Sequence, residues 1–152
     1  YGFGLDQILV QMHDESLVHS AVELNDGTLI IDYGKPDMHN PIRWALYEGK
    51  AFGDIIKIKS FDELKECHFH EYDARRYPCT EFAKQALREG ATKMVALNAA
   101  NEVLVNKYLR DEIKFLDIAK GVEKTLSKTP INKSPTLEEI IALDKQIREE
   151  TK

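Results

Sequence analysis

The 152-residue chain lacks the features that mark several large classes of protein. No apolar run approaches the roughly 20 residues that cross a bilayer, so we expect no membrane partner. Two cysteines, Cys67 and Cys79, are too few for a disulfide framework and suit a reducing compartment. Acidic residues exceed basic ones, giving a formal net charge of -5, whereas nucleic-acid-binding domains are usually basic. We therefore expect no nucleic-acid partner.

Motifs that cradle nucleotide phosphates are also missing. Neither a Gly-x-Gly-x-x-Gly turn nor a P-loop occurs, so no phosphate cradle of either kind is expected within these residues. The first residues, YGFGLDQ, carry neither a positive n-region nor an apolar h-region, which argues against a signal peptide. They carry no initiator methionine either, and we expect the chain to begin inside a longer polypeptide.

The chain has 43% apolar and 31% charged residues. Its sequence pattern predicts an α+β fold in three parts. Residues 1–49 are predicted to form an α/β piece, residues 50–76 a linker, and residues 77–152 a four-helix bundle. The predicted elements of the first two parts are a strand at 7–12, a hairpin at 17–33, a helix at 41–48 ended by Gly49, and an extended piece near 55–59. The predicted helices of the bundle lie at 78–88, at 92–111, at 115–126 and after a capping box that starts at Thr136.

The run from His13 to Met38 is the most informative part of the sequence. Asp26-Gly27 predicts a type I′ turn, because both central residues of that turn need positive φ. Counting outward from it gives one apolar face, with the pairs Leu24–Leu29, Val22–Ile31 and Ser20–Tyr33. The other face is mixed and polar, with the pairs Glu23–Ile30, Ala21–Asp32 and His19–Gly34. His19 would then point away from the apolar face, and the glycine would leave room for a ligand beside its ring.

Four residues of this run are candidates for ligand contact. His19 can exchange hydrogen bonds as a neutral imidazole or hold a phosphate as a cation, and Ser16 and His13 lie just before it. Alternatively, all three cap and satisfy a strand end. Met38, after Pro36-Asp37, has a soft thioether that can pack against a flat heterocycle, or it fills the core.

Two further motifs contain residues that could make specific polar or metal contacts. Asn98 and Asn101-Glu102 interrupt a helix, and because Asn is a poor helix former we expect tertiary hydrogen bonds that tie the bundle to a neighbouring loop. The run Cys67-His68-Phe69-His70 suggests a metal, but it lacks the paired spacing that closes a tetrahedral site. The lysines 124, 128 and 133 are interpreted as a solvated face.

Four blocks of the sequence resemble one known family. The segments LVHSAVELNDGTLIIDYGKPDMHNPI, RRYPCTEFAKQAL, VALNAANEVLVNKYL and IKFLDIAKGVEKTL resemble 1-deoxy-D-xylulose 5-phosphate reductoisomerases, in the same order and at similar spacing. They cover roughly residues 8–127, with LNAANE and the VHS…DG…PDM pattern the most specific. The tail at 130–152 matches only as a terminal helix.

The resemblance implies the second half of that enzyme. The family isomerises deoxyxylulose phosphate and then reduces it to methylerythritol phosphate with NADPH, while Mg²⁺ or Mn²⁺ chelates the substrate oxygens. Its dinucleotide domain and metal-binding carboxylates precede the part seen here. The resemblance therefore implies an oxidoreductase of non-mevalonate isoprenoid biosynthesis, a homodimer, with no metal ligand in this chain and the remainder of the enzyme N-terminal to Tyr1. It also implies a bacterial cytoplasm or a plastid-type organelle.

Carried over residue by residue, the resemblance implies contact roles. His19 matches a histidine near the active site, Ser16 a substrate-binding serine, and Pro36 with Met38 the turn that packs near the nicotinamide. The family usually has His-Pro-Gln-Ser where this chain has His-Asp-Glu-Ser at 13–16, and the Asp14 and Glu15 carboxylates would repel a phosphate if they faced it. The usual Trp-Pro after the PDM helix is replaced by Tyr-Glu-Gly at 47–49.

Three interpretations follow from the sequence. The first is the C-terminal part of the reductoisomerase, inactive as an isolated chain. The second is a non-catalytic dimerisation or binding module that uses the 17–33 hairpin as an edge. The third is a metal-binding domain built on Cys67, His68 and His70.

Overall fold

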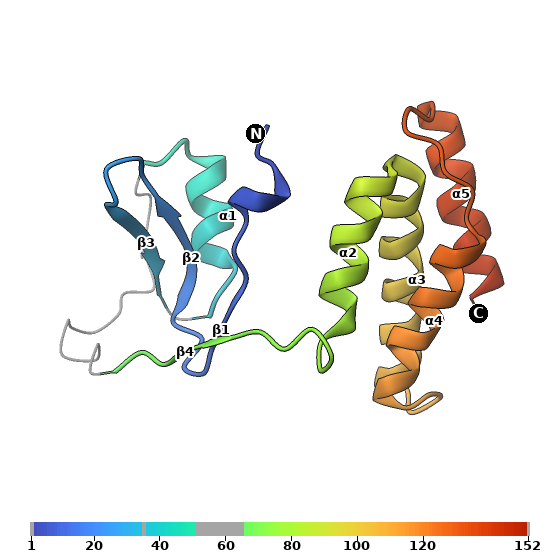
Figure 1. The fold of residues 1–152 in the computed structure, drawn as a ribbon, viewed down its shortest axis with the longest axis horizontal. Helices are drawn as coiled ribbons and strands as arrows, with labels where there is room; N and C mark the ends of the chain where they lie inside the picture. Colours follow the sequence, from blue (N-terminus) through green and yellow to red (C-terminus); the bar gives the residue numbers. More distant parts are fainter. Residues whose placement is uncertain (1, 35, 51–65, 152) are drawn as a thin grey trace. The chain divides into compact units, whose positions relative to one another are not determined.

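The computed structural model describes residues 2–34, 36–50 and 66–151. Within these ranges it has five α-helices and two small antiparallel sheets, and the predicted α+β class is confirmed. The chain divides into two compact units (Figure 1). We call Ile8–Tyr72 the strand unit, and Tyr1–Gln7 with Asp73–Lys152 the helical unit. The extended piece predicted near 55–59, with most of the predicted linker, lies outside the described residues.

The first sheet of the strand unit pairs two short strands from distant parts of the sequence. Strand β1 (Gln11–His13) runs antiparallel to β4 (Phe69–Glu71), with His13 opposite Phe69. The strand predicted at 7–12 is therefore wrong in its extent, because the 3₁₀ helix η1 (Leu5–Gln7) precedes it and β1 begins only at Gln11. A strand needs a partner for its backbone groups, and the three residues of β4 set the length of β1.

The second sheet is the predicted hairpin, with a register one residue away from the prediction. Strands β2 (Val18–Glu23) and β3 (Leu29–Tyr33) are joined by the loop of residues 24–28. The Gly27 N–H donates to the Leu24 carbonyl at 2.9 Å, the Leu24 N–H donates to the Thr28 carbonyl at 2.9 Å, and Gly27 alone has positive φ (83°) in this loop. This geometry is that of a type I turn followed by a left-handed glycine, and it replaces the predicted type I′ turn.

The shifted register changes which side chains share a face. The observed pairs are Glu23–Leu29, Val22–Ile30, Ala21–Ile31 and Ser20–Asp32. A shift of one residue moves side chains between faces, so apolar and polar residues now occur on both. Most of the hairpin is exposed, including Ile30 at 58%. The predicted apolar core face is therefore wrong.

Helix α1 (His39–Leu46) begins two residues earlier than predicted. Its N-cap residue, Met38, makes no side-chain capping bond, and the Asp37 carboxylate accepts the backbone N–H of His39 at 2.9 Å. Proline is tolerated in the first turn, because the N–H groups there have no partner within the helix. The helix ends at Leu46, two residues before the predicted end, and a turn follows in which Gly49, with φ 77°, donates its N–H to the Trp44 carbonyl.

The helical unit matches the prediction closely in its element positions. Its helices are α2 (Pro78–Glu89), α3 (Ala91–Leu109), α4 (Phe115–Lys128) and α5 (Leu137–Glu150). The predicted capping box is confirmed, because Thr136 accepts the Glu139 N–H and the Glu139 carboxylate accepts the Thr136 N–H. The left-handed Gly90 separates α2 from α3.

The core of the helical unit forms around α3, which packs against each of α2, α4 and α5. Small residues of α3 are fully buried, namely Ala96, Ala99 and Ala100. Leu104 of α3 lies over Gly121 of α4, where an added β-carbon would sit 2.6 Å from Leu104 Cδ1. The two helices can approach this closely because glycine has no side chain.

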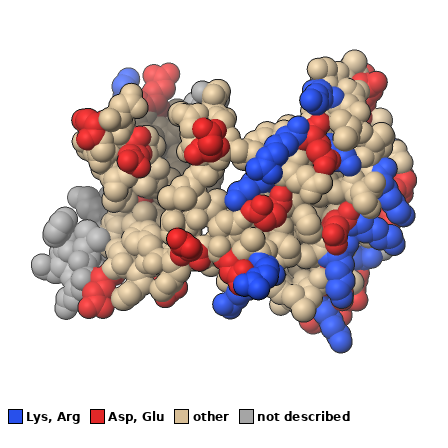
Figure 2. Space-filling model, in the orientation of Figure 1, with Lys and Arg blue, Asp and Glu red and all other residues tan. Residues whose placement is uncertain are grey.

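Charge is distributed unevenly between the two units. On the face seen in Figure 2, Lys and Arg side chains lie mostly over α2–α5. Within the described part of the strand unit, Arg43 and Lys50 are the only lysine or arginine residues among many carboxylates. None of the helices in the described ranges has both the length and the apolarity needed to cross a bilayer.

Candidate functional site

The turn between β1 and β2 carries Ser16 in an uncommon backbone conformation. Ser16 has φ 52°, in the left-handed region that few non-glycine residues adopt. Its N–H donates to the His13 carbonyl at 3.3 Å, which closes the turn. The turn also reaches the segment before β4, because the Asp14 N–H lies 3.4 Å from the His68 carbonyl oxygen.

The His13 imidazole is buried between this turn and β4, with its side chain 7% exposed. It stacks on Phe69 at 4.5 Å between ring centroids, and Nδ1 lies 3.1 Å from both the His68 carbonyl oxygen and Glu15 Oε2. Nε2 is buried without a hydrogen-bond partner among the described residues. His13 therefore caps a strand end, which is one of the two interpretations that the sequence left open.

Two carboxylates of the turn point at two histidines. Glu15 Oε1 lies 2.5 Å from His68 Nδ1, and Glu15 Oε2 accepts the His68 backbone N–H at 3.0 Å. Asp14 Oδ2 lies 3.1 Å from His70 Nε2. Hydrogen bonds from the His68 side chain and backbone lower the pKa of Glu15 to about 2. The hydrogen bond to Glu15, with its negative charge, raises the pKa of His68. The carboxylates that seemed poised to repel a phosphate are thus engaged with histidines.

These contacts bear on the metal-binding interpretation. His68 and His70 face Glu15 and Asp14, and Cys67 makes no third ligand with them. No group of three or more His, Cys, Asp or Glu side chains in the described ranges is arranged to hold a metal ion. The structure therefore gives no support to a metal centre on Cys67, His68 and His70.

His19 lies beside Gly34, as the sequence predicted, but through a different local geometry. Strand β2 has an irregularity between Val18 and Ser20, and His19 Nε2 lies 3.1 Å from the Gly34 carbonyl oxygen. The Gly34 N–H in turn donates to the Leu17 carbonyl at 2.8 Å. An added β-carbon at Gly34 would meet no described heavy atom within 4 Å, so the position of a side chain at residue 34 is open.

The segment after β3 brings Pro36 and Met38 to the same end of the hairpin. Because β2 begins where β3 ends, Ser16 and His19 lie at the end from which residues 34–38 lead into α1. Met38 stands at the start of α1 and is 67% exposed, so it does not fill the core. Pro36 is exposed as well. The topology thus gathers the four predicted contact residues at one open end.

In the motif Asn98-x-x-Asn101-Glu102, the tertiary hydrogen bond comes from Glu102 and not from the asparagines as predicted. Within the described ranges neither asparagine side chain makes a hydrogen bond, and Asn98 is exposed. Glu102 provides the tertiary contact, because Arg148 of α5 donates to it at 2.8 Å and to Asp144 at 2.7 Å. The motif therefore ties α3 to α5 and not to a loop.

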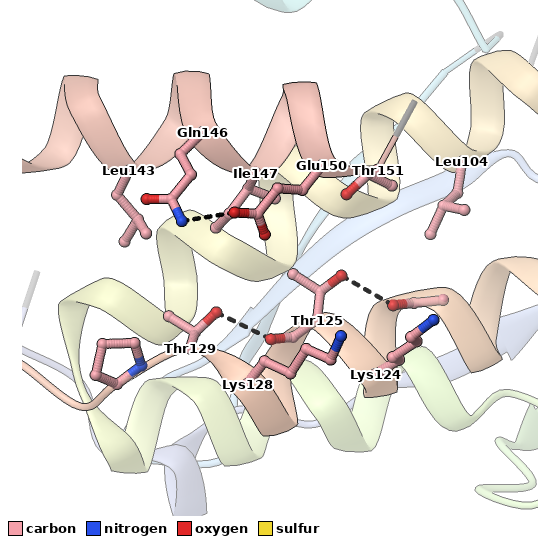
Figure 3. Close-up of a pocket in the computed structure, with 12 residues that line it drawn as sticks. Leu104, Lys124, Thr125, Lys128, Thr129, Leu143, Gln146, Ile147, Glu150 and Thr151 are labelled. Carbon is pink, nitrogen blue, oxygen red and sulfur yellow. Dashed lines mark hydrogen bonds between the residues drawn. The ribbon is translucent and has the colours of Figure 1, made fainter.

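One further feature, which no sequence pattern predicts, is a cavity of about 660 Å³ between α4 and α5. Figure 3 shows Lys124 and Lys128 on one side of it and Gln146 and Glu150, joined by a hydrogen bond, on the other. The two lysines are exposed, as expected for a solvated face. The Glu15–His68 contact was also missed, although two carboxylates at 14–15 and two histidines at 68 and 70 form a complementary pattern.

Comparison with known proteins identifies relatives of the whole chain. A family model described as the DXP reductoisomerase C-terminal domain matches residues 33–150. The 1-deoxy-D-xylulose 5-phosphate reductoisomerase of Desulforamulus reducens is 42% identical over 151 residues, which are 99% of this chain and 39% of that protein. That of Shouchella clausii is 41% identical over 152 residues, covering 99% of this chain and 40% of that protein.

Solved structures agree with these relatives. The reductoisomerase from Zymomonas mobilis in complex with NADPH has a TM-score of 0.85 at 33% identity and covers 98% of this chain and 39% of its own. Another, in complex with NADPH, fosmidomycin and magnesium, has a TM-score of 0.81 at 31% identity and covers 93% of this chain and 37% of its own. The chain thus spans about two fifths of the length of the relatives it matches. Because the C-terminal domain model matches residues 33–150, the chain belongs to the DXP reductoisomerase family.

Proposed function

We propose that this chain is the C-terminal part of an NADPH-dependent reductoisomerase that converts 1-deoxy-D-xylulose 5-phosphate to 2-C-methyl-D-erythritol 4-phosphate. The observation that carries the proposal is the similarity to such a reductoisomerase over 99% of the chain at 42% identity. In this proposal residues 1–49 end the catalytic domain, residues 50–76 connect, and residues 77–152 form the C-terminal helical domain.

The open end of the hairpin supplies contact residues to that reaction. The exposed His19 ring, next to open space at Gly34, is suited to a hydrogen bond or a charged contact with the sugar phosphate. The Ser16 hydroxyl adds a neutral donor and acceptor to the same end. Pro36 and the exposed Met38 offer an apolar surface for the nicotinamide ring.

The two cofactors have different support in this chain. NADPH would supply the hydride, and an exposed thioether and proline fit contact with a flat ring. Mg²⁺ or Mn²⁺ would chelate substrate oxygens, but the described residues offer no group of three ligands, so we assign no metal contact to them.

Substitution of His19 tests the site. In the intact enzyme, His19→Ala should lower kcat/KM for 1-deoxy-D-xylulose 5-phosphate about 10- to 100-fold, the effect of losing one hydrogen bond to a charged group. Thermal unfolding should change little, because the side chain is exposed. His70→Gln, which alters another exposed imidazole of the strand unit, is the matched control. An unchanged kcat/KM in His19→Ala would remove His19 from the site.

We also propose that the hairpin pairs with a second copy of this chain in a homodimer. Two strands alone are marginally stable in water, and β2 and β3 expose Val22 at 56%, Leu29 at 57% and Ile30 at 58%. Light scattering should then report a mass that rises toward a dimer with concentration, and Ile30→Lys should lower it. Lys145→Glu, a charge change on α5, is the control. A strict monomer at every concentration would contradict the pairing.

A further inference from the structure

The Glu15 carboxylate connects three parts of the strand unit. One oxygen lies 2.5 Å from the His68 imidazole Nδ1. The other accepts the His68 backbone N–H at 3.0 Å and lies 3.1 Å from His13 Nδ1. A single side chain in the β1–β2 turn thus holds the end of β1 and the segment that enters β4. The two halves of this contact are 53 residues apart in the sequence.

The residue that depends most on this contact is Ser16. It follows Glu15 directly and has φ 52°, a conformation that persists only where the surroundings enforce it. The hydrogen bond from its N–H to the His13 carbonyl, which closes the turn, is long at 3.3 Å. The side-chain contacts of Glu15 with His68 are shorter and involve charge, so they define the turn more strongly.

The charge of Glu15 also matters for an anionic ligand. The described part of the strand unit has carboxylates in excess, with Arg43 and Lys50 as its only lysine or arginine. An unpaired Glu15 carboxylate next to Ser16 would repel a phosphate ester. With both oxygens hydrogen-bonded to His68, that charge is countered where the substrate would approach.

We propose that Glu15 and His68 are positioning residues for Ser16, fixing the turn that presents its hydroxyl and countering the carboxylate beside it. This inference rests on the proposed function, in which Ser16 contacts the sugar phosphate. Neither residue touches the substrate itself, and both act through the turn. His68 thus balances the acidic residue that directly precedes Ser16.

The geometry implies that the strength of the Glu15–His68 pair falls as the pH rises. The pair is complete while Glu15 is ionised and His68 is protonated. The pKa of Glu15 is held at about 2, so acid does not break the pair in an ordinary assay range. The pKa of His68 is raised, chiefly by its hydrogen bond to Glu15, and the pair weakens as the pH rises through that value. The other titratable groups facing it are His13 against Glu15, and Asp14 with its partner His70.

Steady-state kinetics of the intact enzyme test the proposal. His68→Gln should raise KM for 1-deoxy-D-xylulose 5-phosphate about 10-fold with a small change in kcat, because substrate binding and not the chemical step is affected. The double variant Glu15→Gln/His68→Gln should recover most of this loss, since it removes the uncompensated charge and two amides can still hydrogen-bond. The matched control is His70→Gln, whose partner Asp14 is 67% exposed and therefore screened by water, so it should change KM much less.

A pH profile provides a readout that a purely structural role would not move. In the wild type KM should rise as the pH passes the pKa of His68, and in Glu15→Gln this rise should flatten. This second variant also keeps the test decisive if His68→Gln does not fold. An unchanged KM in His68→Gln, or an equal pH profile in Glu15→Gln, would overturn the proposal.

Ser16→Ala distinguishes the proposed contact of Ser16 with the substrate from the positioning role of Glu15 and His68. If Ser16→Ala raises KM and His68→Gln does not, the positioning role is wrong and the proposed function stands. If neither changes KM, Ser16 does not contact the substrate, and both the assigned contact and the positioning role are wrong.

Discussion

In the β1–β2 turn, single carboxylate residues contact histidines from a distant part of the sequence. Glu15 would place an unpaired negative charge beside Ser16, yet His68 donates to both of its oxygens. Asp14 makes a single contact with His70, from Oδ2 to Nε2 at 3.1 Å. Each carboxylate of the turn therefore has an imidazole partner from the segment around β4, and Glu15 is held at both of its oxygens.

The pKa of His68 is the direct measure of this match. NMR titration of the chain should give a His68 pKa above the ordinary value of about 6.5, because Glu15 stabilises the protonated ring. Glu15→Gln should bring it back toward that value, and Asp14→Asn should lower it less. The stability that His68 contributes is full below about pH 6.5 and is lost as the pH rises through the raised pKa. A His68 pKa that Glu15→Gln does not lower would contradict the contact.

At the scale of secondary-structure elements, the close approach of α3 and α4 depends on one small residue. Gly121 faces Leu104, which is 7% exposed, and a β-carbon at Gly121 would lie 2.6 Å from Leu104 Cδ1. Glycine within a helix costs about 1 kcal/mol of stability relative to alanine. Its place in the middle of α4 is therefore explained by packing and not by helix propensity.

A double-mutant cycle tests this packing. Leu104→Ala should destabilise the chain by about 2–5 kcal/mol, because it leaves a cavity in the core. Gly121→Ala should destabilise it by about 1 kcal/mol, the net of overpacking and improved helix propensity. In the Leu104→Ala background Gly121→Ala should instead be neutral or stabilising, since the added methyl enters the space that the leucine left. Urea unfolding measures all three variants, and additive effects would show that the two residues do not interact.

For the whole molecule, our proposal makes the open end of the hairpin one part of a larger site. The chain covers 39% of the Desulforamulus reducens relative, and the described residues hold no group of three metal ligands. His19, Ser16, Pro36 and Met38 would thus act together with groups from the remainder of the enzyme.

The isolated chain should therefore be inactive. Mixed with NADPH, Mg²⁺ and 1-deoxy-D-xylulose 5-phosphate, it should cause no loss of NADPH absorbance, while the intact enzyme under the same conditions should consume NADPH. Turnover that scales with the concentration of the chain and disappears in its His19→Ala variant would show that the site is complete without the remainder.

The sequence by itself determined what local interactions specify. The four helices of residues 78–150, the capping box at Thr136 and the break at Gly90 follow from hydrophobic periodicity, caps and backbone freedom. The proximity of His19 and Gly34 was also predictable, because a single turn separates their strands. Only the tertiary structure decided the hairpin register, since Asp26-Gly27 suits two turn types that differ by one residue. It alone brought His68 to Glu15, because a contact between residues 53 positions apart depends on the pairing of β1 with β4 and leaves no local pattern.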